Sequence, residues 1–362
     1  MFINTPAQFH FYRNIAKKLE ENGNQIIILF RNYGETLALA REYGLDAFVF
    51  AEKAKSPYEK LVSFPMDLIR AVKKLRQFKP DVVTGFGLYE GYSSLFVVSN
   101  SIVFTDSEPR SHRLLRLQYA LFKPLTDVII TPSTFRDYLG EKHIRIDSYK
   151  ELAYLHPNYY KPNDDIFEYL GISKGEEYAV LRFNAFDAVH DLQVSGFNPD
   201  QKVRLVKSLS NYARIFVSGE GKIPNGIKDH VLKTPKSRIH DVLYYAKLLV
   251  TDTQTMATEA ALLGTPTIRS NNFVDLKREM GNFIELEKRY GLLFNIRDRE
   301  AAISLAEELA NRKGLKDEWR AKRELLLKEK IDVSSFMVWF IENFPESYSI
   351  IKLDPEVQYN FV

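Results

Sequence analysis

Residues 248–269 constrain the fold more than any other segment, because strand, turn, helix and strand follow one another within a short span. Residues 248–250 form an apolar strand end, and the hydroxyl-rich residues 251–255 form a turn. Residues 256–263 follow a helical pattern, which Gly264 closes before a second strand that ends at Arg269. A strand that leads through a polar turn into a helix is the repeating unit of α/β proteins.

The turn before this helix is a candidate anion site. Backbone N–H groups are unpaired at a helix start, and the helix dipole attracts a negative group by about 0.3–1 kcal/mol. Glu259 lies about one helical turn further on, where its carboxylate can accept hydrogen bonds from two ribose hydroxyls. Phosphate at the turn and sugar at Glu259 together indicate a nucleotide. The alternative is structural: Thr253 or Thr255 caps the helix, and Glu259 is solvated on its outer face.

The composition is that of a globular protein with ample core, since 45% of the residues are hydrophobic and 27% are charged. The length of 362 residues suggests about two domains. A net charge of +3 is too small to indicate a nucleic-acid partner. The chain has no cysteine, which excludes disulfides, thiolate catalysis and cysteine metal sites and fits a cytoplasmic protein. No apolar run approaches the roughly 20 residues of a membrane span, and no secretory signal is visible.

Apolar strands alternate with amphipathic helices along most of the chain, which indicates parallel α/β layers. In the first half we expect strands at 2–4, 25–31, 47–50, 81–85, 101–106 and 127–131, and helices at 7–22, 35–43, 57–78, 92–98 and 111–122. In the second half we expect strands at 178–183, 213–217, 248–251, 267–269 and 292–294, and helices at 199–209, 239–246, 256–263, 277–289, 299–310 and 315–330. The very short first strand has two explanations: the sheet edge is brief, or the chain start lacks a few residues.

We expect two parallel α/β domains. The first domain comprises 1–155, a linker with two prolines follows at 156–164, and the nucleotide-binding domain comprises 165–332. Residues 333–362 form an aromatic, apolar helix and tail that return to the first domain. The ligand is expected in a cleft between the domains, near the carboxyl ends of both sheets.

The segment TDTQTMATEAALLGTPTIR resembles the C-terminal signature of the GT-B superfamily. It is most similar to the non-hydrolysing UDP-N-acetylglucosamine 2-epimerases and to the uncharacterised, largely archaeal DUF354 family. Further segments similar to DUF354 cover nearly the whole chain: NTPAQFHF, FTDSE, VLRFNAFDAVH and NNFVDLKREMGNFIELEKRYGLL. The resemblance implies a GT-B fold of two Rossmann-like domains, the first on the acceptor or sugar side and the second binding the nucleotide.

The resemblance also implies roles for residues of the second domain. Thr253, Thr255 and Met256 would contact the diphosphate, and Glu259 would hold the ribose. His240 falls where GT-B enzymes approach the base; the alternative is that it caps its helix.

Five more residues of this domain complete the implied site. Ser218 and Gly219 begin the sequence Ser-Gly-Glu-Gly, which is either a loop near the nucleotide or an ordinary strand-ending turn. Arg182 and His190 flank a stretch that resembles the region of a functional histidine in the epimerases; a lone histidine is more often structural. Arg269 pairs with phosphate in a bidentate way or forms a salt bridge to a neighbouring carboxylate.

In the first domain, Asp106 and Glu108 are the candidate acid and base, because alternate positions of an extended chain share one face. Glu108 resembles a catalytic acid of the epimerases, although their His-Val-Glu-Ala-Gly motif reads Thr-Asp-Ser-Glu-Pro here, and their N-terminal arginine is missing. His10 is either a base that faces an acceptor hydroxyl or a surface residue of the first helical turn.

Arg110, Arg113 and Arg116 place positive charge on one predicted helix face. This face either meets a phosphate-bearing acceptor or a lipid headgroup, or is simply solvated.

The expected function is that of a GT-B glycosyltransferase that uses a nucleotide sugar, with a UDP-sugar as substrate. No separate cofactor is expected, and no metal, because positive groups and a helix N-terminus can stabilise the departing diphosphate and no Asp-X-Asp triplet is present. The alternatives are a UDP-GlcNAc 2-epimerase-like enzyme and a non-catalytic nucleotide-sugar-binding protein. The acceptor is unknown, with phosphate-bearing and lipid-linked acceptors both open, as are peripheral membrane association and a homodimer. No nucleic-acid partner and no transmembrane segment are expected.

Overall fold

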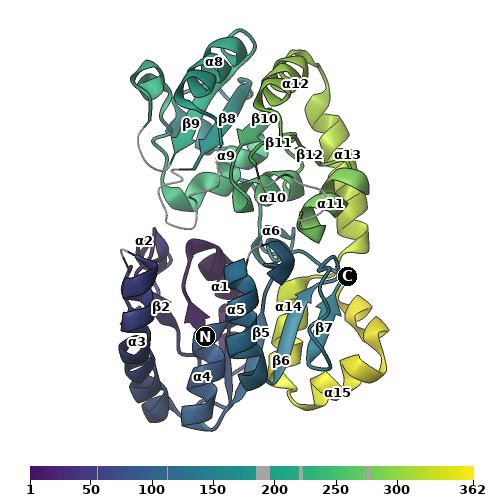
Figure 1. Cartoon of the computed structure of the whole chain (residues 1–362). Helices are drawn as coiled ribbons and strands as arrows, with labels where there is room; N and C mark the ends of the chain where they lie inside the picture. Colours follow the sequence, from purple (N-terminus) through teal and green to yellow (C-terminus); the bar gives the residue numbers. More distant parts are fainter. Residues whose placement is uncertain (55, 112, 185–195, 220–222, 273, 275–278) are drawn as a thin grey trace. The chain divides into compact units, whose positions relative to one another are not determined.

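The computed structural model describes the chain apart from residues 55, 112, 185–195, 220–222, 273 and 275–278. The chain forms two compact units (Figure 1). Unit 1 comprises Met1–Tyr159 together with Glu329–Val362, and unit 2 comprises Tyr160–Lys328. Unit 2 is therefore inserted into unit 1 along the sequence.

Unit 1 contains parallel strands in the orders β1-β2-β3 and β4-β5-β6-β7, and β1 lies next to β4. The chain builds outward from β1 to β3, then crosses to β4 and builds outward on the other side. The point where the strand order reverses therefore lies between β1 and β4. The strands are β1 (Phe2–Ile3), β2 (Leu29–Arg31), β3 (Phe48–Ala51), β4 (Val82–Gly85), β5 (Asn100–Phe104), β6 (Val128–Pro132) and β7 (His143–Ile146).

Helix α1 of unit 1 begins where the sequence supplies a cap. The hydroxyl of Thr5 accepts the N–H of Gln8, and Pro6 occupies the first turn of α1. The helices are α1 (Pro6–Glu21), α2 (Thr36–Glu42), α3 (Pro57–Phe78), α4 (Leu88–Val97), α5 (Arg113–Phe122), α6 (Leu152–Leu155), α14 (Val333–Glu342) and α15 (Glu346–Leu353), with 3-10 turns at Pro109–Ser111, Lys123–Leu125 and Pro355–Phe361.

The C-terminal segment completes unit 1. Helix α14 packs against α1 and α6, and the segment lies beside β6 and β7 (Figure 1, yellow). Tyr348 donates a hydrogen bond to the carbonyl of Glu141, 3.0 Å away, just before β7. The predicted return of the last helix to the first domain is confirmed.

Unit 2 contains one parallel sheet in the order β12-β11-β10-β8-β9, with its reversal point between β8 and β10. The strands are β8 (Tyr178–Phe183), β9 (Arg214–Gly219), β10 (Leu248–Thr251), β11 (Thr267–Arg269) and β12 (Leu293–Asn295). The helices are α7 (Ile166–Leu170), α8 (Pro199–Leu209), α9 (Ile239–Tyr245), α10 (Thr255–Leu262), α11 (Gly281–Lys288), α12 (Arg299–Asn311) and α13 (Leu315–Glu329), with 3-10 turns at Asn225–His230 and Lys236–Arg238. Two Rossmann-like units of parallel strands and helices confirm the predicted fold class.

Some details differ from the sequence-based prediction. The strand expected at 101–106 ends at Phe104, so Asp106 lies in the following loop. The helix expected at 111–122 begins at Arg113 and is preceded by a separate 3-10 turn that contains Arg110. Strand β7 and helices α7 and α15 were not predicted.

Candidate functional site

The strands of unit 2 end in a common row at one edge of the sheet. Their register aligns, from β9 to β12, Ser218, Arg182, Thr251, Arg269 and Asn295. The reversal point between β8 and β10 lies within this row, and ligands of open α/β sheets bind outside the carboxyl ends of the strands at such points. The turn from β10 into α10 is therefore in the expected place for a ligand.

The start of α10 is not closed by a side chain. Its N-cap residue is Gln254, which makes no side-chain cap hydrogen bond among the described residues. The Thr253 hydroxyl bonds instead to the Thr251 hydroxyl, 2.8 Å away, and Thr255 is the first helical residue. Thr253, Thr255 and Met256 are half-buried. The alternative that a threonine caps this helix is wrong, and the first-turn N–H groups carry the positive end of the helix dipole.

Glu259 and His240 form a buried pair. Glu259 lies one turn into α10 and is 6% exposed, and Nε2 of His240, from α9, lies 3.2 Å from its Oε1. Glu259 is therefore not a solvated residue on the outer face. His240 does not cap α9, because the N-cap of that helix is Arg238. The carboxylate is held in a fixed orientation close to the open helix start.

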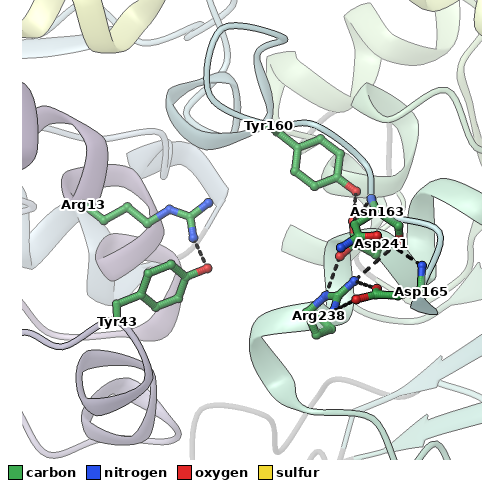
Figure 2. Close-up of polar contacts among 7 residues, drawn as sticks. All are labelled: Arg13, Tyr43, Tyr160, Asn163, Asp165, Arg238 and Asp241. Carbon is green, nitrogen blue, oxygen red and sulfur yellow. Dashed lines mark hydrogen bonds and ion pairs between the residues drawn. The ribbon is translucent and has the colours of Figure 1, made fainter. Parts of the chain in front are cut away.

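The first turn of α9 is anchored to the segment that enters unit 2 (Figure 2). The Asp241 carboxylate accepts hydrogen bonds from the Tyr160 hydroxyl at 2.7 Å, the Asn163 N–H at 3.1 Å and Nε of Arg238 at 2.7 Å. Arg238 also forms an ion pair with Asp165, which, with Asp241, raises the pKa of the guanidinium. These contacts fix the backbone that carries His240.

Asp252 lies at the same edge of the sheet, and it was not singled out from the sequence. It follows β10 directly, is 2% exposed, and accepts the N–H of Asn184 at 2.7 Å. Burial raises the pKa of its carboxyl to about 6. The sequence does contain a signal for Asp252, because an acidic residue directly after an apolar strand lies at the sheet edge where ligands bind. Asp252 connects the ends of β8 and β10 across the reversal point.

Arg182 and Ser218 lie together, and Nη1 of Arg182 donates to the Ser218 hydroxyl at 3.0 Å. Gly219 ends β9, and a Cβ there would lie 3.3 Å from the side chain of Ile223, a tight fit. The structure therefore places these three residues at the same sheet edge as the start of α10. His190 and the Glu-Gly pair after Gly219 lie outside the described residues.

Arg269 forms a buried salt bridge at the end of β11. Its side chain is 1% exposed, and Nη1 lies 2.9 Å from a Glu279 oxygen and 2.8 Å from Oδ1 of Asn295. The guanidinium carbon also lies 3.8 Å from the centre of the Phe283 ring. The salt-bridge alternative is correct, because burial here requires that the cation be paired inside the protein.

In unit 1, the two candidate carboxylates are held by different cations. Nζ of Lys150 lies 2.6 Å from Asp106 and 3.4 Å from Glu151. Burial alone would lower the pKa of Lys150, but these carboxylates outweigh it and raise that pKa. Glu108 is 1% exposed and lies 3.5 Å from Nε of Arg110. The Asp106–Lys150 pair is a feature that residue spacing did not predict.

His10 is buried in α1. Its ring centre lies 5.1 Å from that of Tyr154 and 5.6 Å from that of Phe9, so it is not a surface residue of the first turn. Arg13, one turn further on, donates to the Tyr43 hydroxyl (Figure 2).

The predicted arginine stripe is also wrong in part. Arg110 lies outside α5 and is bonded through Nε and Nη2 to Asp137, at 3.1 and 2.9 Å. Only Arg113 and Arg116 lie on the helix.

In unit 1, the helix that corresponds to α10 is α4, and the side chain of Glu90 caps its start. Its carboxylate accepts the N–H groups of Phe86 and Gly87, each at 3.0 Å, at the start of α4, and it is fully buried. Burial, opposed by these hydrogen bonds, raises its pKa to about 6. The sequence signal was a glutamate three residues after a glycine N-cap, the spacing of a capping box.

Comparison with known proteins identifies the family. The family model described as "Protein of unknown function (DUF354)" matches residues 2–291. The chain belongs to the DUF354 family. An uncharacterised protein of Methanocaldococcus jannaschii is 21% identical over 272 residues, which cover 72% of this chain and 77% of that protein.

Solved structures show which fold this DUF354 member has. The UDP-GlcNAc 2-epimerase of Neisseria meningitidis bound to UDP-GlcNAc is 12% identical, with a TM-score of 0.59 over 90% of this chain and 98% of that chain. The spinosyn forosaminyltransferase SpnP is 11% identical, with a TM-score of 0.60 over 94% and 99%. The fold is GT-B, shared with UDP-GlcNAc 2-epimerases and glycosyltransferases. None of the helices in the described part of the chain has both the length and the hydropathy to cross a bilayer.

Proposed function

We propose that this DUF354 protein is an enzyme that uses a nucleotide sugar, and that unit 2 binds its nucleotide. The observation that carries the proposal is the open start of α10 at the reversal point of the sheet, with the buried Glu259–His240 pair one turn away. An anion is favoured at this helix start, and a carboxylate at that distance suits a ribose.

In this proposal, the diphosphate contacts the backbone and hydroxyls of Thr253 and Thr255 and the backbone of Met256. Glu259 accepts hydrogen bonds from the two ribose hydroxyls, while His240 holds its carboxylate in position. Arg182 and Ser218 extend the polar edge next to the diphosphate. The likeness to an epimerase solved with UDP-GlcNAc supports a UDP-sugar as the substrate class.

The activity that we propose is glycosyl transfer. Unit 1 binds the acceptor and supplies the base, for which Asp106, Glu108 and His10 are the candidates, together with His190 of unit 2. A cation lies beside each acidic residue, Lys150 beside Asp106 and Arg110 beside Glu108. The helix dipole of α10 stabilises the negative charge that develops on the departing nucleoside diphosphate.

A second candidate is a 2-epimerase-like reaction, in which one bound sugar loses and regains its nucleotide. The observation that favours it is the whole-chain likeness to UDP-GlcNAc 2-epimerases, together with the resemblance of Glu108 to a catalytic acid of those enzymes. This epimerase-like reaction requires Glu108 to contact the sugar ring of the nucleotide sugar rather than an acceptor.

The binding step is tested by calorimetry and thermal shift with UDP. Glu259→Gln preserves size and removes the charge, so we expect UDP affinity to fall about 100-fold, the effect of losing two charge-assisted hydrogen bonds. Glu308→Gln, an exposed residue of α12, is the matched control and should bind UDP normally. Equal UDP affinity of the two variants would contradict the site.

The activity is tested by product analysis with UDP-GlcNAc and related nucleotide sugars. Transfer predicts release of UDP only when an acceptor is present, whereas epimerisation predicts the C2 epimer from the nucleotide sugar alone. UDP binding without turnover of any nucleotide sugar, in the wild-type chain as in Glu108→Gln and His190→Ala, would leave a non-catalytic nucleotide-sugar-binding protein as the function.

A further inference from the structure

The outward side of three consecutive helices of unit 1 exposes large apolar side chains. Helix α4 packs against both α3 and α5, so the three helices form a continuous layer. We call the side of this layer turned away from the sheet the α3–α5 face. Its exposed apolar residues are Met66 and Ile69 on α3, Leu95 on α4, and Leu114, Leu117 and Leu121 on α5, which are 44–58% exposed.

The leucines of α5 form a second apolar stripe rather than a frayed part of the core. Leu114, Leu117 and Leu121 follow the spacing of one helix side. Tyr119 and Phe122 point the other way, into the buried cluster of unit 1. A globular helix needs only one apolar side to pack, so the fold does not account for the outer leucines. Exposed apolar surfaces of this extent usually mark an interaction site.

The charges around this face are positive. Arg113 and Arg116 are exposed on α5, which has no acidic residue, and Lys73 is exposed on α3. Of the acidic residues of these helices, Asp67 on α3 and Glu90 on α4 are buried, and Glu59 in the first turn of α3 is exposed. The face therefore combines outward leucines with cations and has little exposed negative charge.

We propose that the α3–α5 face docks on an anionic membrane surface. The leucines would enter the boundary between headgroups and acyl chains, while Arg113 and Arg116 pair with lipid phosphates, as in interfacial amphipathic helices. A second copy of the chain fits less well, because a two-fold contact would bring the same arginines together. The positive charge of the face therefore favours an anionic membrane over a second copy of the chain. None of these residues belongs to the proposed nucleotide site, so the inference does not depend on the proposed function.

The test is co-sedimentation of the full chain with vesicles of phosphatidylcholine alone or mixed with phosphatidylglycerol. We expect binding to the anionic vesicles and its loss in high salt. Arg113→Gln with Arg116→Gln should weaken it roughly thirtyfold, since each basic residue near such a surface contributes about fivefold. Leu117→Gln with Leu121→Gln should weaken it at least about tenfold.

Leu325→Gln is the matched control, because Leu325 is 53% exposed on α13 of unit 2 and should not affect binding. Circular dichroism and the melting temperature of each variant show that the fold is retained. Two results would overturn the proposal: no binding to either vesicle by the folded wild-type chain, or a wild-type dimer in solution that the Leu117/Leu121 variant dissociates.

Discussion

Helices α4 and α10 occupy equivalent places in the topologies of the two units, but their N-terminal ends differ in whether a side chain caps them. Each follows a strand at the reversal point of its sheet, β4 in unit 1 and β10 in unit 2. The start of α4 is filled by the protein's own carboxylate, Glu90, whereas no side chain in the described part of the chain caps the start of α10. The Glu90 side chain occupies the helix start in unit 1 and leaves no place for an external anion there, so the nucleotide site is expected in unit 2 alone.

The largest effect is expected from Gly85→Ala, which tests how tightly Glu90 closes α4. A Cβ at position 85 would lie 1.7 Å from Oε1 of Glu90, so the carboxylate must leave the N–H groups of Phe86 and Gly87. We expect unit 1 to lose about 3 kcal/mol of unfolding free energy, measured by urea denaturation.

Gly226→Ala is the control, since its Cβ would lie 3.7 Å from Val203, an ordinary contact. In a Glu90→Ala background the cost of Gly85→Ala should largely disappear. Fully additive costs would show that the two residues do not act together.

The next effect concerns pH. The pKa of Glu90 is raised from 4.5 to about 6, so the folded state keeps a proton that the unfolded chain releases. Stability from this group is therefore complete below about pH 4.5 and is lost as the pH rises through about 6, by roughly 2 kcal/mol. Glu90→Gln should remove this decline.

The two tryptophans allow this measurement in unit 1, because Trp339 lies in unit 1 and Trp319 in unit 2. Denaturation followed by Trp339 fluorescence, in a Trp319→Phe background, reports on unit 1. An unchanged pH profile in Glu90→Gln would assign the decline to other groups.

A smaller effect is expected when the start of α10 is made to resemble that of α4. Met256→Glu adds a carboxylate to its half-buried first turn. We expect about tenfold weaker UDP binding than in Met256→Gln, through repulsion of roughly 1–2 kcal/mol. The helix itself should gain about 0.5 kcal/mol from its dipole. Calorimetry measures the UDP affinity of both variants. Equal affinities would mean that the diphosphate does not bind at the start of α10.

The smallest effect is expected from Ser218→Ala, at the edge of the same row. The hydroxyl accepts from Arg182 at 3.0 Å, so its loss frees the guanidinium without removing it. We expect UDP affinity to change about threefold, the result of losing one modest hydrogen bond. A change above about thirtyfold would mean that Ser218 itself contacts the nucleotide.

The fold was predictable because apolar strands and amphipathic helices alternate with clear periods. The strand at Tyr178–Phe183 and the helix at Pro199–Leu209 have the predicted bounds. Strand β7 was missed because it is a short edge strand that carries the exposed Arg145. Periodicity cannot separate such a segment from a loop.

The candidate site was less predictable, because the sequence does not reveal which opposite charges meet. Arg269 was a candidate phosphate ligand, but Glu279 neutralises it inside the protein. The Asp106–Lys150 pair joins residues 44 positions apart, and no spacing rule links them. Local signals did exist for the buried carboxylates of Glu90 and Asp252.

The insertion of unit 2 into unit 1 has a consequence for synthesis. Helix α1 owes much of its packing to α14, yet all of Tyr160–Lys328 separates the two halves of unit 1 in the sequence. On the ribosome, the inserted unit can be complete while α1 still awaits its last partner. Helix α1 is thus translated before unit 2 and yet completes its native packing after it.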